Sequence, residues 1–174
     1  MIVRSLILLF VGILWSFSSL AQEEKLKEGM LAPNILGQNT KGETVILYEI
    51  EAKVIILQFW ASWNEYSIEQ AKESIRPMYR VLKNEGLAVV GFSLDDSIKD
   101  WKRAISQNRI NWIQISDGLG FNSPFSQEYH VKQIPSLLIL DENFKILSIN
   151  PTLDEMANIV EGQISKIAKN DYDN

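Results

Sequence analysis

The chain lacks cysteine altogether and contains a single histidine, His130, among its 174 residues. Without cysteine there can be no disulfide bond, no thiol catalysis, no thiolate metal site and no lipid attached to a cysteine. A metal site or catalytic dyad that uses histidine would have to include His130. The chain also has no cluster of lysine and arginine, and its net charge is −5, so we expect no nucleic-acid partner.

The rest of the composition is typical of a globular domain. Hydrophobic residues make up 46% of the chain and charged residues 22%, which gives enough apolar side chains for a sizeable core. We find no internal repeat and no interdomain linker. The sequence therefore predicts one folded domain.

The first 21 residues have the pattern of a secretory signal peptide. Arg4 provides a basic start, residues 6–17 form an apolar run that is short for a membrane span, and Ser19 and Ala21 have the spacing of a cleavage site. We expect export to the periplasm or out of the cell, with no stable membrane span after cleavage. An N-terminal anchor that is not cleaved is the alternative.

Beyond this segment, apolar β-branched runs alternate with segments that have helical spacing. We expect strands at residues 44–50, 53–60, 87–94, 111–116, 136–141 and 145–149, and helices at 64–84, from 97, at 126–130 and from 152. Pro77 predicts a kink or break in the first helix. This order predicts an α/β fold, a mixed central sheet with helices on both faces.

Local signals refine this prediction. Capping boxes predict helix starts at Ser97 and Thr152. In the first of these helices, the spacing of the apolar residues predicts that Ile98 and Trp101 face the core. Asn143 is the expected left-handed turn residue between the last two strands.

Four segments are also similar to segments of one protein family. They read "GMLAPNILGQNTKGETV", "VIILQFWASW", "VVGFSLDDSIKDWKRAI" and "WIQISDGLGFNSPFSQEYHVKQIPSLLILD". Together they resemble the thioredoxin superfamily, most closely its secreted TlpA/ResA-like, AhpC/TSA-related branch of thiol–disulfide proteins. The resemblance implies a thioredoxin-like domain over residues 44–168, preceded by a lead-in at 22–43 and followed by a frayed polar tail at 169–174.

The resemblance implies a Cys-x-x-Cys pair directly after "WASW", where this chain has Asn64 and Ser67. In the family, a helix N-terminus stabilises the first thiolate, which then attacks disulfides. An amide cannot attack a disulfide, and a serine hydroxyl without a positioned base is too basic. Gln58 stands where some thioredoxins have a proton-relay carboxylate, and it cannot titrate. We therefore expect no catalytic residue and no thiol–disulfide activity.

The two altered positions also have simple structural interpretations. Asn64 is a good N-cap residue, and direct contact with a ligand is the alternative. Ser62 with Glu65 offers a competing capping box. Ser67 is expected to be solvated or hydrogen-bonded to the backbone.

Aromatic and loop residues near these positions are the candidate binding residues. Trp60 ends a buried strand and is expected in the core. Trp63 could pack under the loop or form a contact surface, and Tyr66 is expected to face solvent. The resemblance implies a cis peptide bond before Pro135, with the backbone of Ile134 available to an extended polypeptide.

The remaining polar candidates favour structural roles. Adjacent carboxylates point in different directions, so Asp95 and Asp96 are interpreted as a strand-end turn and helix cap instead of a metal site. His130 is expected at the surface or at the rim of the site. We therefore predict no metal and no cofactor.

The leading hypothesis is an exported, redox-inactive module that binds or scaffolds an extended polypeptide or an envelope protein. One rival is an enzyme with a thiol-independent activity. Another alternative is an oxidoreductase in name only, whose family label follows from the fold and not from the site. A further one is a paralogue that has kept its fold but no function.

The predicted cleavage after Ala21 can be measured directly. N-terminal sequencing or intact mass of the protein from the cell envelope should give a chain that begins at Gln22. A chain that keeps residues 1–21 and is found in the soluble cytoplasmic fraction would show that the segment is not a cleaved signal.

Overall fold

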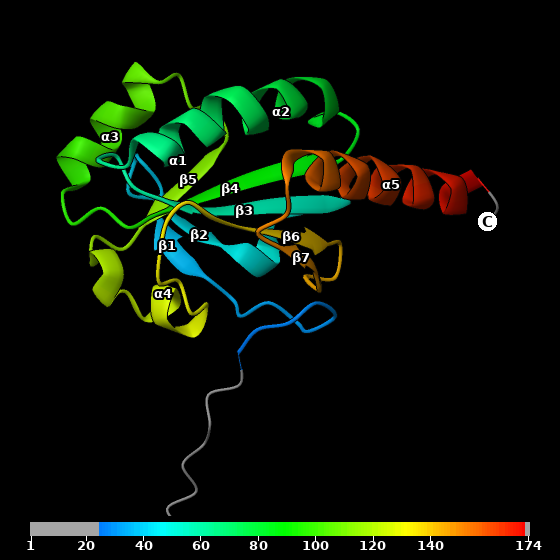
Figure 1. The fold of residues 1–174 in the computed structure, drawn as a ribbon, viewed down its shortest axis with the longest axis horizontal. Coiled ribbons are helices and arrows are strands. Elements are labelled where there is room, and N and C mark those ends of the chain that lie inside the picture. Colours follow the sequence, from blue (N-terminus) through cyan, green and yellow to red (C-terminus); the bar gives the residue numbers. More distant parts are fainter. Residues whose placement is uncertain (1–24, 173–174) are drawn as a thin grey trace, which may run out of the picture.

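The computed structural model describes residues 25–172, so the predicted signal peptide lies outside the described residues. Figure 1 shows one twisted central sheet with helical segments above and below it. Its seven strands run in the order β2-β1-β5-β4-β3-β6-β7. The prediction of an α/β fold with a mixed sheet is confirmed.

The strand bounds agree with most of the predicted runs to within two residues. The strands are β1 (Leu36–Gln38), β2 (Thr44–Ile46), β3 (Val54–Trp60), β4 (Leu87–Ser93), β5 (Ile113–Ser116), β6 (Ser136–Asp141) and β7 (Ile146–Ile149). Neighbouring strands β3, β4 and β5 are parallel, whereas β6, β7, β1 and β2 each pair antiparallel with their neighbours. β1 lies within the lead-in and is part of this sheet.

The helical segments cover both faces of the sheet. They are η1 (Leu47–Glu49), α1 (Glu65–Glu69), η2 (Gln70–Ile75), α2 (Arg76–Leu82), α3 (Ile98–Gln107), η3 (Gly120–Asn122), α4 (Pro124–Glu128) and α5 (Leu153–Tyr172). In Figure 1, α1, α2, α3 and α5 lie on one side, and α4 and the lead-in lie on the other. The helices on both faces are therefore as predicted.

The break predicted at Pro77 is present as a wide helical turn. α1, η2 and α2 follow each other without a gap, and η2 is a π-helical turn that ends just before the proline. Proline has no N–H to donate to the preceding turn. The N–H of Arg76 donates to the carbonyl of Ala71, five residues earlier, which is the π-helical pattern.

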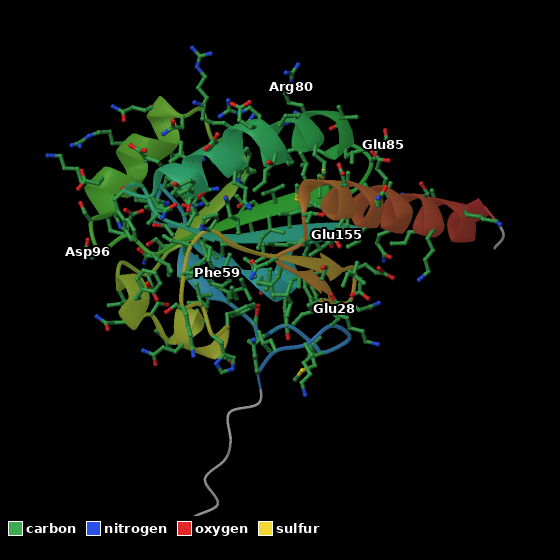
Figure 2. The ribbon with its side chains drawn as sticks, viewed as in Figure 1. Glu28, Phe59, Arg80, Glu85, Asp96 and Glu155 are labelled. Atoms are coloured by element: carbon green, nitrogen blue, oxygen red, sulfur yellow. The ribbon has the colours of Figure 1, made fainter. Side chains whose placement is uncertain are left out.

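The core consists of two apolar clusters, one on each face of β3. All seven residues of β3 are buried, and they alternate between the clusters, with Val54 and Ile56 on the helix side and Ile55 and Leu57 on the other. This explains why the segment reads as a continuous apolar run. In Figure 2 the labelled side chain of Phe59 lies inside the body of the molecule.

Three local predictions are wrong. The strand expected over residues 44–50 ends at Ile46 and is followed by the short helix η1. The left-handed residue of the β6–β7 turn is Phe144 (φ 61°) and not Asn143, because the Asp141 carboxylate accepts hydrogen bonds from the N–H groups of residues 143 and 145. Ile98 is 40% exposed, whereas Trp101 is buried as expected.

The predicted starts of both later helices are confirmed. The Ser97 hydroxyl accepts from the N–H of Asp100, and Thr152 with Glu155 forms a reciprocal capping box. The backbone of α5 is helical through Tyr172, and so through most of the polar tail.

Candidate functional site

The loop between β3 and α1 is fixed by the buried carboxyl group of Asp95, which is 1% exposed. Its two oxygens accept from the N–H of Ser62 at 3.1 and 3.0 Å, and one of them accepts from the Ser62 hydroxyl at 2.5 Å. The hydroxyl of Ser93, at the end of β4, donates to the other oxygen at 2.7 Å. Asp95 thus joins the loop to the central sheet, and α3 is capped by Ser97 instead.

Asn64 is the N-cap of α1, as predicted. Its Oδ1 accepts from the N–H of Ser67 at 2.8 Å and from the Ser67 hydroxyl at 2.9 Å. The alternative prediction, a capping box formed by Ser62 and Glu65, is wrong, because the Ser62 hydroxyl donates to Asp95. The expectation that Ser67 is solvated is also wrong, since its side chain is 0% exposed and donates to an amide oxygen. The side chains of Asn64 and Ser67 therefore face each other.

The loop that contains Pro135 lies against the start of α1. The Ile134–Pro135 peptide bond is cis, and the Asn64 Nδ2 group donates a long hydrogen bond of 3.4 Å to the carbonyl of Ile134. No hydrogen bond within the described residues uses the N–H of Ile134. One backbone donor next to the altered pair therefore remains available to a ligand.

Gln58 is buried below the first helical turn. Its Nε2 donates to the side-chain oxygen of Gln70 at 2.9 Å and to the carbonyl of Ser67 at 3.3 Å. The amide therefore connects β3 to the helix with uncharged hydrogen bonds. Among the described residues, no group of three or more His, Asp or Glu side chains could hold a metal ion.

Exposed aromatic side chains surround the altered pair. Trp63 is 58% exposed and Tyr66 is 74% exposed, whereas Trp60 is in the core, as predicted, and its indole N–H donates to Gln114 at 2.9 Å. The ring of Trp63 lies 6.4 Å from the ring of Phe121, which is also exposed. The exposed aromatic surface is thus larger than the sequence analysis predicted.

Phe121 could have been found from its local sequence, "DGLGFN". Gly118 and Gly120 both have positive φ, a conformation that glycine adopts without strain. The loop they shape exposes Leu119 and Phe121. A phenylalanine in a loop shaped by glycines is the local signal that could have indicated an exposed aromatic side chain.

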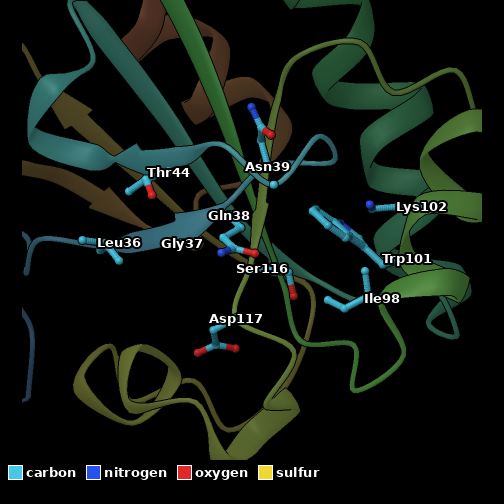
Figure 3. A pocket seen from close by; sticks show the side chains of 11 residues that line it. Leu36, Gly37, Gln38, Asn39, Thr44, Ile98, Trp101, Lys102, Ser116 and Asp117 are labelled. Atoms are coloured by element: carbon cyan, nitrogen blue, oxygen red, sulfur yellow. The ribbon is translucent and has the colours of Figure 1, made fainter.

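A cavity of about 410 Å³ lies between the β1–β2 hairpin and α3. Figure 3 shows Trp101 and Lys102 of α3 on one side and Leu36 and Gln38 of β1 on the other. Neither Asn64 nor Ser67 lines it. This cavity is therefore distinct from the surface around Trp63.

The comparisons with known proteins agree with this geometry. A family model described as thioredoxin-like matches residues 51–146, and the chain belongs to this family. It is 22% identical over 148 residues to the protein called thiol-disulfide oxidoreductase ResA of Bacillus cereus, covering 84% of this chain and 82% of that relative.

Solved structures show the same fold. A C-terminal domain from Bacteroides thetaiotaomicron, assigned as a thiol-disulfide oxidoreductase, superposes with a TM-score of 0.76 at 30% identity over 80% of this chain and 97% of that one. A thiol-disulfide oxidoreductase from Bacteroides fragilis gives a TM-score of 0.70 at 26% identity over 76% of this chain and 98% of its own. The chain thus has the fold of these proteins but no thiol.

The contacts of Asp95 predict a large difference between two adjacent carboxylates. Asp95→Asn replaces one acceptor oxygen by an amide group that cannot accept from Ser62 or Ser93, so the free energy of unfolding should fall by about 2 kcal/mol. Asp96→Asn is the matched control, because Asp96 is exposed and should change stability by less than about 0.5 kcal/mol. Urea unfolding of both variants measures the difference. Equal stabilities would contradict the assigned role of Asp95.

Proposed function

We propose that the chain is an exported, redox-inactive thioredoxin-like protein that binds an extended polypeptide. The binding residues are Trp63, Tyr66, Ile134 and Pro135. The observation that carries the proposal is the combination of exposed aromatic side chains with a free backbone N–H at Ile134, directly beside a pair that cannot exchange disulfides.

The chemistry of the altered pair supports a binding role over redox chemistry. Thiol–disulfide exchange, which the names of the relatives describe, needs a thiolate, and this chain has no cysteine. A serine nucleophile would need a base, but the Ser67 hydroxyl is buried and donates to the amide oxygen of Asn64. The pair therefore has its hydrogen bonds satisfied internally and stabilises the start of α1.

The surface around the pair has the properties of a polypeptide-binding site. Large aromatic side chains such as Trp63 and Tyr66 contribute much of the affinity in protein interfaces, because they bury a large area at a small entropic cost. A free backbone N–H such as that of Ile134 can pair with the main chain of an extended segment whatever its side chains are. Backbone pairing would set the position of the polypeptide, and the aromatic side chains would select for apolar residues.

The proposed location is outside the cytoplasm, after removal of the segment that ends at Ala21. Within the part of the chain that the structure describes, no helix has the length and hydropathy that crossing a membrane requires. The partner would then be an unfolded or extended segment of an envelope or secreted protein.

The proposal can be tested with a fluorescein-labelled, carboxymethylated insulin B chain as an unfolded polypeptide probe. Trp63→Ala should raise the dissociation constant about tenfold or more, since loss of an interface tryptophan commonly costs about 2 kcal/mol. Tyr66→Ala should weaken binding in the same direction. Val81→Ala is the control, because this side chain is apolar and exposed on α2, away from the site. Anisotropy titrations with unchanged affinity in the Trp63 and Tyr66 variants would refute the proposed surface.

A further inference from the structure

Another cavity, of about 580 Å³, adjoins the Pro135 loop. Gln133 and Ser136, which flank the cis bond, are part of its wall. Other parts of the wall come from the lead-in, the segment after α4, β6 and the end of β7. A polypeptide bound along the backbone of Ile134 would therefore reach this cavity.

The wall of this cavity is cationic. Lys25 and Lys132 line it together with His130, and no carboxylate among the described residues does. Neither lysine forms an ion pair within the described part of the chain. The whole protein has a net charge of −5, whereas the described wall of this cavity has two lysines and no carboxylate. We refer to it as the cationic cavity.

The opposite side of the site has the reverse charge. A cavity of about 420 Å³ beside α1 is lined by Glu65, Glu69 and Glu73, with Lys72 as the only cation in its described wall. The two cavities share no residue in their walls. The candidate site thus has an acidic side and a basic side, which would orient a charged ligand.

Two left-handed residues that are not glycine also line the cationic cavity. His130 and Asn150 both have a φ of 52°, a conformation that costs energy for side chains other than glycine and that occurs more often at ligand sites. The Asn150 Oδ1 accepts from the N–H of Leu137 at 2.7 Å. Its Nδ2 group donates no hydrogen bond within the described residues, so it adds a neutral donor to the two lysines.

We propose that the cationic cavity binds an acidic side chain, Asp or Glu, of the same extended polypeptide whose apolar residue contacts Trp63. This inference rests on the proposed function and adds the chemical class of the partner. The two lysines and the Asn150 amide are donors for a carboxylate, and the apolar side chains of Leu26 and Ile149 in the wall can contact its aliphatic stem. The acidic side of the site disfavours a second carboxylate beside α1.

The test compares matched nine-residue peptides that bind the full chain. Each has a central Val-Phe-Val, blocked ends and a pair of glutamates at one end, and its control has glutamine in their place. One peptide has the glutamates at its N-terminal end and the other at its C-terminal end. In low salt, one of these two peptides should bind about fivefold or more tightly than its glutamine control. Lys132→Met and Lys25→Met should remove this preference. Lys99→Met should keep it, because Lys99 is exposed on α3 and does not line the cavity. A glutamine peptide with a free C-terminal carboxylate tests whether the cavity takes a chain end instead.

A second measurement examines the cavity without the peptide. N-acetylglutamate α-amide has a side-chain carboxylate as its only charge, and N-acetylglutamine amide is its neutral counterpart. We expect only the charged compound to shift the backbone amide resonances of Lys132, Gln133 and Asn150, and Lys132→Met to abolish the shifts.

The outcomes separate the two proposals. Peptides that bind in a Trp63-dependent manner without a preference for glutamate would overturn the acidic partner and leave the proposed function standing. Resonance shifts with the charged compound but no peptide binding would overturn the proposed function and keep the carboxylate subsite. Neither binding nor shifts would refute both, and a preference only for the free C-terminus would overturn the side-chain assignment.

Discussion

The hydrogen bonds of the Asn64 side chain are the contacts on which the candidate site depends. One end of the amide accepts from the backbone and the hydroxyl of Ser67, and the other donates to the carbonyl of Ile134. A single side chain therefore caps the helix and joins it to the Pro135 loop. Thiol–disulfide exchange needs a thiolate, whereas at this position the chain has an amide whose contacts are hydrogen bonds to Ser67 and Ile134.

Two further buried polar groups make the site rigid. Asp95 joins the loop before α1 to the end of β4, and Gln58 joins β3 to the helical turn below Ser67. Unpaired buried polar groups are costly, and paired ones favour one arrangement over others. The exposed ring of Trp63 is therefore held on a hydrogen-bonded loop, which would lower the entropic cost of binding the proposed polypeptide.

The sequence predicted every strand of the sheet except β1, because runs such as residues 53–60 are buried on both faces and read as apolar without interruption. It also predicted the cap at Asn64, which depends on local chemistry. It could not predict the burial of Ser67 or the contacts of Asp95, because both depend on which side chains the tertiary fold brings together. The turn at the left-handed residue Phe144 has two sets of contacts that the sequence analysis did not consider: the local hydrogen bonds that the Asp141 carboxylate accepts from the N–H groups of residues 143 and 145, and the stacking of the Phe144 ring on Tyr48 at 4.7 Å.

The central claim is that the segment is a thioredoxin active site from which only the sulfur is missing. The most direct test is the thiolate absorbance of the variant Asn64→Cys/Ser67→Cys as a function of pH. The thiol introduced at position 64 lies at the start of the helical segment and should have a pKa about one unit or more below the free-thiol value of about 8.5. A pKa at or above that value would contradict the account.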